Sequence, residues 1–216
     1  MILFVHGFGV LKDSRGMYVD ILRSVNEDCH LLEFNSFNTE SNELRVAPLD
    51  RQIAHLEETD ARFKNTPYTL IAHSQGCMVA AKAQLKNVKH TILLAPASGS
   101  SSSGMKAFFA ERPDTTFAED GTARLARKDG TTTIVNALYW QSLDNYGDVK
   151  TAYQNYAKNH PSHIVLAGDD TTVRNEVASS VQGVPIDTIP NANHNFDEPH
   201  RQALIAHIKR LLRTAN

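Results

Sequence analysis

The sequence has few cysteines, no marked excess of charge of one sign and no long apolar run. Two cysteines, Cys29 and Cys77, are too few for a disulfide framework, and no Cys/His spacing matches a structural zinc site, so a reducing compartment is the simpler prediction. The net charge of -2 and the isoelectric point near 6.5 argue against nucleic-acid binding. The opening apolar run is too short for a signal peptide, and no stretch approaches a membrane span. We therefore expect a cytoplasmic protein with a small-molecule partner, no nucleic acid and no stable membrane association.

The most informative stretch is an apolar strand that ends in a small-x-Ser-x-Gly turn before a helix. Residues 71–79 read Ile-Ala-His-Ser-Gln-Gly-Cys-Met-Val. This pattern predicts a nucleophile elbow, a strand-to-helix corner that strains the backbone of Ser74 and exposes its hydroxyl. Ala72 stands where a glycine is more usual, but it is still small enough for the strand and the helix to pass closely. A chance Ser-x-Gly turn gives the same pattern, so the choice between the two interpretations depends on whether the sequence offers partners for Ser74.

The first partner is the segment His6-Gly7-Phe8-Gly9, which directly follows the apolar run 2–5. The run is typical of a buried parallel strand, so the strand ends at a tight, glycine-rich loop. Acyl transfer passes through a tetrahedral oxyanion that needs two preorganised N–H donors. In an elbow architecture these donors come from the residue after the nucleophile and from such an early loop, which here means Gln75 and Phe8. An ordinary strand-ending turn is the alternative, and we expect His6 to brace this loop rather than to react.

Two further strands end in polar loops that supply an acid and a histidine. The apolar run 162–167 leads into Gly168, Asp169 and Asp170, and the run 184–189 leads into a loop that holds His194. Ser74, Asp170 and His194 therefore follow one another in the chain order Ser, Asp, His that elbow enzymes use. A lone loop histidine among the ten of this chain is more often a surface group, but its position after the last strand favours a functional role.

Together these motifs resemble those of the α/β-hydrolase fold superfamily, close to its small carboxylesterases and lipases, over most of the chain. The resemblance implies Ser74 as nucleophile, His194 as base and Asp170 as orienting acid, with no metal and no organic cofactor. Spacing from Gly168 leaves Asp169 as an alternative acid; Asp170 is favoured because Asp-x-x-Val, with the valine opening a helix, matches the family better. Some relatives carry the acid one strand earlier, but the loop after residues 91–95 holds no carboxylate before Glu111.

The alternation of apolar strands and amphipathic helices predicts an α/β fold with a mostly parallel sheet covered on both faces, a three-layer sandwich. The 216 residues fit one domain, 1–216. Because the chain opens on the strand before the oxyanion loop, we expect a minimal hydrolase that lacks the superfamily's first two antiparallel strands. Six strands are predicted at 2–5, 30–34, 68–73, 90–95, 162–167 and 184–189, and helices at 14–27, 47–64, 75–86, 172–181 and 199–213.

Residues 97–160 break this alternation where many relatives carry a lid. The segment holds half of the chain's sixteen aromatic residues, too many to leave in water, so we predict a small cap packed over the carboxyl edge of the sheet. Asp-Gly in the stretch 124–135 predicts a hairpin. Phe108 and Phe109 are predicted to wall an acyl pocket, although ordinary core packing is the commoner role for any single aromatic residue.

These features predict a serine esterase that cleaves esters of short to medium acyl chains through an acyl-enzyme on Ser74. A thioesterase, an amidase or an acyltransferase would use the same residues, and the fold also supports ligand-binding proteins without catalysis. A coenzyme A thioester is less favoured because no basic cluster is evident in the sequence to meet its phosphates.

Overall fold

Six parallel strands form the central sheet of the protein, in the order β11-β10-β6-β5-β1-β2. The computed structural model describes residues 1–99, 101–127 and 129–214. The innermost strands are apolar and fully buried, as the sequence patterns predict for a sheet covered on both faces. The bounds of the six strands are β1 Ile2–Val5, β2 Cys29–Leu32, β5 Tyr68–His73, β6 Val88–Leu94, β10 Ser162–Ala167 and β11 Ile186–Ile189.

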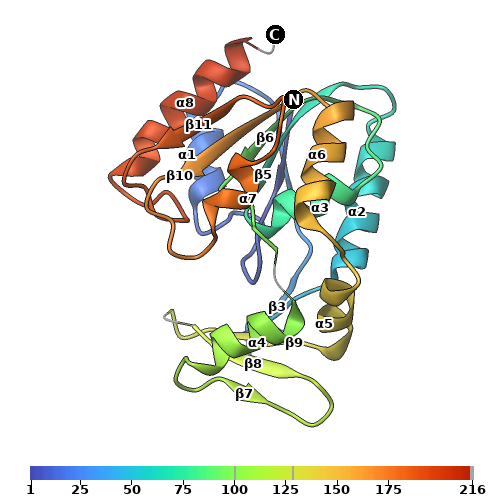
Figure 1. Ribbon diagram of the computed structural model, residues 1–216, viewed down its shortest axis with the longest axis vertical. Helices are drawn as coiled ribbons and strands as arrows, with labels where there is room; N and C mark the ends of the chain where they lie inside the picture. Colours follow the sequence, from blue (N-terminus) through green and yellow to red (C-terminus); the bar gives the residue numbers. More distant parts are fainter. Residues whose placement is uncertain (100, 128, 215–216) are drawn as a thin grey trace.

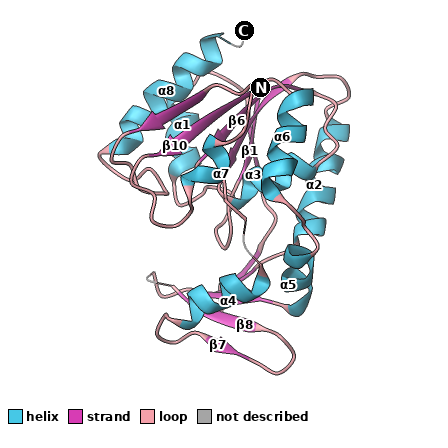
Figure 2. Ribbon diagram, in the orientation of Figure 1, coloured by secondary structure: helices cyan, strands magenta, loops and turns pink. Residues whose placement is uncertain are grey.

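Helices cover both faces of this sheet, which confirms the predicted three-layer α/β fold (Figure 2). One buried cluster joins strand residues such as Phe4 and Ile92 to α1 (Met17–Ser24) and α8 (His200–Thr214). The opposite face packs against the other layer, formed by α2 (Leu49–Arg62), α3 (Gln75–Lys82) and α6 (Val149–Asn159). A short helix, α7 (Asn175–Ser179), follows β10.

A second, five-stranded sheet lies in a smaller lobe beneath the main body (Figure 1). Its order is β3-β4-β9-β8-β7. The predicted hairpin is present: β8 and β9 pair antiparallel from Ala123↔Val135 to Ala126↔Thr132. The lobe also carries α4 (Ser102–Ala110) and α5 (Ala137–Asp144). Its strands are β3 Ser36–Asn38, β4 Glu43–Arg45, β7 Thr116–Phe117, β8 Ala123–Ala126 and β9 Thr132–Val135.

This lobe differs in two respects from the predicted insertion 97–160. Strands β3 and β4 come from residues before α2, and β4 pairs in parallel with β9. Helix α6, although it lies within 97–160, packs on α3 and α7 in the main body. The segment 97–160 therefore contributes to both parts, and the lobe is completed by an excursion of the chain after β2.

The two cysteines are unpaired; Cys29 is partly buried and Cys77 is buried. Cys77 is buried on α3, where its thiol donates to Ala72 O at 3.3 Å, as expected for packing on a helix face. Among the described residues, none of the helices has the length and apolar character needed to cross a bilayer.

Candidate active site

Ser74 lies at the sharp corner between β5 and α3, with φ 55° and ψ -123°. This is the strained conformation that the elbow motif predicts, since a non-glycine residue with positive φ is held only by its surroundings. The backbone on both sides is fixed by the next strand: Ser74 N donates to Leu94 O at 3.0 Å, and Ala97 N donates to Ser74 O at 3.2 Å. The end of β6 thus holds the corner in place.

Two glycines allow the loop after β1 to lie against this corner. A Cβ on Gly76 would lie 2.6 Å from His6 O and even closer to Val5 O, and both are backbone atoms. A Cβ on Gly7 would lie 3.1 Å from the Ser74 Cβ. Only glycine at position 76 permits this approach, so the first turn of α3 and the predicted oxyanion loop are in direct contact.

His194 connects the serine to a carboxylate. Its Nδ1–H donates to Asp170 Oδ2 at 2.7 Å, and its Nε2 accepts from the Ser74 hydroxyl at 2.9 Å. His194 follows β11 and Asp170 follows β10, so the carboxyl ends of two neighbouring strands bring the three side chains together. The structure therefore places the predicted residues in one hydrogen-bonded series.

Asp170, and not Asp169, makes this contact. The Asp170 side chain is fully buried, and its other oxygen accepts from Thr172 N at 2.8 Å and Val173 N at 3.0 Å. Burial by itself would raise the pKa of this carboxyl, but the hydrogen bonds and the charge of His194 outweigh burial and lower the pKa. Asp170 is therefore an anion at neutral pH, whereas Asp169 is exposed.

His73 supports His194, the predicted base, a role that the sequence did not indicate. It is buried, its Nε2–H donates to His194 O at 2.9 Å, and its Nδ1 accepts from Ser14 Oγ at 3.4 Å. Burial, and then the nearby His194 ring at 4.9 Å, lower the pKa of His73 to about 3. The only sequence signal was its place within the apolar strand, where a polar side chain needs a partner.

The predicted oxyanion donors lie on the two segments that meet at Ser74. Gln75 is the first residue of α3, and Phe8 lies in the loop after β1. Neither backbone N–H has an acceptor within the described part of the chain. His6 braces the loop as expected: its Nδ1–H donates to Gly7 O at 2.9 Å, and its Nε2 accepts from Phe34 N at 3.1 Å.

The side chain of Gln75 joins the elbow to the lobe. Its amide nitrogen donates to Gln52 Oε1 at 3.2 Å, and its carbonyl oxygen accepts a short hydrogen bond from the hydroxyl of Tyr139 on α5. All three residues are buried. This polar chain links α2, α3 and the lobe at the residue whose N–H is a predicted oxyanion donor.

The two phenylalanines predicted to wall the pocket have different environments. Phe109 is buried, and its ring centroid lies 5.8 Å from that of Phe8. Phe108 is 46% exposed and contacts Phe109 edge to face. Tyr139 completes an aromatic cluster at 5.4 Å from Phe8. Phe109 thus lies against the oxyanion loop, and Phe108 lies outside it.

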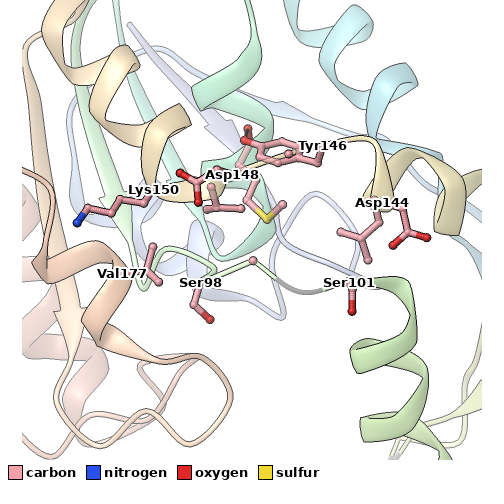
Figure 3. A pocket seen from close by; sticks show the side chains of 12 residues that line it. Ser98, Ser101, Asp144, Tyr146, Asp148, Lys150 and Val177 are labelled. Carbon is pink, nitrogen blue, oxygen red and sulfur yellow. Dashed lines mark hydrogen bonds between the residues drawn. The ribbon is translucent and has the colours of Figure 1, made fainter.

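A cavity of about 330 Å³ lies close to the elbow, between the loop after β6 and the connection from α5 to α6 (Figure 3). Met78, one turn along α3 from Ser74, is part of its wall. Neither the residues of the hydrogen-bonded series nor the two phenylalanines line this cavity. Its wall is formed by Met78, Ser98, Gly99, Ser101, Leu143, Asp144, Tyr146, Gly147, Asp148, Val149, Lys150 and Val177.

One group of described side chains has the composition of a metal site, at the opposite end of the strands. His163 and His207 contact the same oxygen of Asp187 at 2.6 and 3.0 Å. Arg210 also contacts that oxygen, at 3.0 Å. A guanidinium occupies the place where a cation would bind, so we interpret the group as an ion-pair network that ties α8 to β10 and β11.

Comparison with known proteins identifies the family. The model of the alpha/beta hydrolase family matches residues 2–206, and the chain belongs to this family. Similar solved structures include Est1E from Butyrivibrio proteoclasticus, at 20% identity and a TM-score of 0.67 over 99% of this chain and 87% of that one.

Two other similar solved structures are a lipase and an esterase. A monoacylglycerol lipase from Paleococcus ferrophilus has 12% identity and a TM-score of 0.70 over 100% of this chain and 94% of that one. A thermophilic esterase from Thermogutta terrifontis has 14% identity and a TM-score of 0.69 over 99% of this chain and 89% of that one. These likenesses show the shared fold. Among curated proteins, none matches this sequence significantly.

Proposed function

We propose that this protein is a serine hydrolase that cleaves carboxylic esters through an acyl-enzyme on Ser74. The observation that carries the proposal is the hydrogen-bonded series from Ser74 through His194 to Asp170, built on a strained elbow. A serine hydroxyl is a weak nucleophile by itself, and a neighbouring base oriented by a carboxylate is what activates it. Membership of the alpha/beta hydrolase family supports this assignment.

In the first half of the proposed reaction, Ser74 Oγ attacks the ester carbonyl while its proton passes to His194 Nε2. Asp170 holds the Nδ1–H tautomer and stabilises the imidazolium that forms. The N–H groups of Phe8 and Gln75 stabilise the negative charge on the carbonyl oxygen, each by about 3 kcal/mol. The tetrahedral intermediate expels the alcohol, which takes the proton from His194, and the acyl group remains on Ser74.

In the second half, water takes the place of the alcohol. His194 removes a proton from water as it attacks the acyl-enzyme, the same two N–H groups hold the new oxyanion, and the acid leaves as the proton returns to Ser74. The aromatic cluster of Phe8, Phe109 and Tyr139 fills space beside the oxyanion loop. Because these rings occupy space that a long acyl chain would need, they support a preference for short to medium acyl chains.

The test is the hydrolysis of p-nitrophenyl esters from acetyl to palmitoyl by the wild type, by Ser74→Ala and by Ser24→Ala. Ser24 is the matched control, because its hydroxyl only donates to Ile21 O at the end of α1. We expect activity that is greatest for short to medium chains, retained in Ser24→Ala and lost in Ser74→Ala. Intact mass after mixing with substrate should show an acyl adduct on the wild type and on Ser24→Ala, and none on Ser74→Ala.

Hydrolysis that survives in a folded Ser74→Ala protein would refute the role of Ser74. If the wild type turned over no ester of the series, the proposed ester chemistry would be wrong, and thioester, amide and acyl-transfer assays with the same variants would follow.

A further inference from the structure

Arg112 and Arg127, from separate parts of the sequence, contact aromatic rings beside the predicted oxyanion loop, and the charge of Arg15 acts on both. Arg15 lies between β1 and α1, Arg112 follows α4, and Arg127 follows β8. Arg127 donates from Nη2 to Gly9 O at 2.9 Å and from Nε to Thr133 Oγ1 at 2.8 Å. It therefore fastens the lobe directly to the loop that carries the Phe8 N–H.

Arg112 and Arg127 lie against different rings of the aromatic cluster. The Arg112 guanidinium carbon lies 4.6 Å from the ring centroid of Phe109, and that of Arg127 lies 5.8 Å from the ring centroid of Phe8. The two rings are 5.8 Å apart. This positive charge therefore lies beside the side chain of the residue whose N–H is a predicted oxyanion donor.

The three positive charges act on one another. Burial, followed by the charges of Arg15 and Arg112, lowers the pKa of Arg127 to about 10. Burial, followed by the charge of Arg15, lowers the pKa of Arg112. Like charges this close destabilise the fold unless something neutralises them.

No carboxylate within the described part of the chain forms an ion pair with any of the three. Asp129 is the acid whose charge acts on Arg127 and Arg15. One of its oxygens already accepts from Thr131 N at 3.0 Å and from the Thr131 hydroxyl at 2.7 Å. The site therefore keeps an excess of positive charge and free guanidinium donors.

We propose that Arg112 and Arg127 bind an anionic group of the substrate, a carboxylate or a phosphate, while the ester carbonyl lies at Ser74. Guanidinium groups are the side chains best suited to both anions, because their planar N–H donors match two oxygens at once. The inference rests on the proposed ester hydrolysis and specifies its substrate class. It also corrects an expectation from the sequence: the structure does bring a basic cluster to this site, which removes the argument against phosphate-bearing substrates.

Two matched substrate pairs separate the two anions. Mono-p-nitrophenyl glutarate and p-nitrophenyl pentanoate share a five-carbon acyl chain and differ in a terminal carboxylate. Butyryl-4′-phosphopantetheine and butyryl-pantetheine share the thioester and the pantetheine arm and differ in the phosphate. We expect kcat/KM to be about tenfold higher for the charged member of at least one pair, as one charge-assisted hydrogen bond supplies, and to fall toward that of the neutral member at high salt.

Arg112→Gln is the informative variant, because the Arg112 side chain does not hydrogen-bond to the predicted oxyanion loop in the described structure. It should lower kcat/KM for the preferred anionic substrate by about tenfold and leave the neutral member within about twofold. Arg62→Gln is the control: it removes the same charge from an exposed position on α2. A uniform loss for both members of a pair would indicate a structural role and overturn the inference.

The inference and the proposed function fail in different ways. Hydrolysis of neutral esters at rates equal to the anionic ones would overturn the inference and leave the serine hydrolase intact. If no substrate were turned over, anion binding would be measured by thermal unfolding with glutarate and with inorganic phosphate. A rise in Tm that Arg112→Gln abolishes would support the anion site, and the absence of any rise would overturn it.

Discussion

At the scale of single residues, the acid that contacts His194 was harder to predict from the sequence than Ser74 and His194 themselves. Ser74 and His194 each stand alone at the end of a strand, whereas Asp169 and Asp170 are adjacent and both follow β10. Which carboxyl turns inward depends on the backbone of the loop. Asp170 accepts from Thr172 N and Val173 N, and this turn directs its second oxygen toward His194.

The pair of aspartates gives the first prediction. Asp170→Asn should lower kcat/KM by about a thousandfold, because an amide in place of the carboxylate favours the wrong imidazole tautomer and leaves the imidazolium without its counter-charge. Asp169→Asn should stay within about twofold of the wild type. Steady-state rates on a short-chain p-nitrophenyl ester measure both, and a larger loss in Asp169→Asn would show that the acid has been misassigned.

His73 shows what a sequence pattern does not contain. Its side chain leaves the strand toward Ser14 and the backbone of His194, partners that lie 59 and 121 residues away. A histidine beside a nucleophile has no spacing rule that reveals such contacts. The proposed arginine site escaped prediction for the same reason, since Arg112 and Arg127 lie fifteen residues apart and meet through the aromatic cluster.

The lowered pKa of His73 gives the second prediction. Unfolded histidine has a pKa near 6.5 and binds a proton as pH falls, whereas buried His73 stays neutral down to about pH 3. The unfolded state therefore gains protons first, and stability that is complete above about pH 7 decreases as pH falls toward 3, with a slope that approaches about 1.4 kcal/mol per pH unit.

Urea unfolding at several pH values between 7 and 4 tests this expectation. His73→Gln keeps a donor for His194 O and removes the titrating group, so its free energy of unfolding should fall less steeply than that of the wild type. The pKa values of half-buried His90 and His207 are also lowered, but both proteins share them and the difference cancels their contribution. Equal slopes would refute the prediction.

At the scale of elements, apolar runs predicted the central strands to within a few residues, whereas the short lobe strands β3, β4 and β7 were not predicted. Strand β5 is buried along its whole length, and residues 70–72 form an apolar run that ends at polar His73. Strand β3, Ser-Phe-Asn, is exposed throughout, and β4 is three residues long. The pairing of β4 with β9, about ninety residues later, is a tertiary interaction that local pattern does not encode.

The contact between β1 and α3 gives the third prediction. Gly76→Ala places a methyl group against the carbonyl oxygens of Val5 and His6, which are backbone atoms that cannot turn away. We expect a loss of about 2 kcal/mol or more in stability and a large loss of activity, because the oxyanion loop must move.

Gly147→Ala is the comparison for this experiment. Position 147 has φ +81° but open space around it, so backbone strain alone should cost about 1 kcal/mol, with activity retained. Equal effects of the two variants, in unfolding and in esterase assays, would mean that the close approach at Gly76 is unimportant.

At the scale of the whole molecule, the central sheet is more deeply buried than the sheet of the lobe. The central sheet is packed on both faces by clusters joined to α1 and α8 on one side and to α2, α3 and α6 on the other. The lobe ends in an edge strand, β7, of only two exposed residues, and Phe117 in it is 41% exposed. The sequence predicted an aromatic insertion over the carboxyl edge, but the sharing of chain between lobe and body depends on long-range pairing.

This difference in burial makes the last prediction, which concerns amide hydrogen exchange. Amides of β5 and β6 can exchange only when the central sheet opens, because their neighbours on both faces are buried. Amides around β7 exchange after a local opening that exposes little new apolar surface. Peptides covering residues 68–73 and 88–94 should therefore exchange at least about tenfold more slowly than those covering 114–122.

The exchange rates of strands β8 and β9 should lie between these two, since Leu125 and Val135 are buried in the cluster that also includes residues of α4 and α5. If the lobe and the central sheet exchanged at one common rate, they would open as a single unit, and the bonds from Arg127 to Gly9 and from Tyr139 to Gln75 would have to be strong enough to couple them.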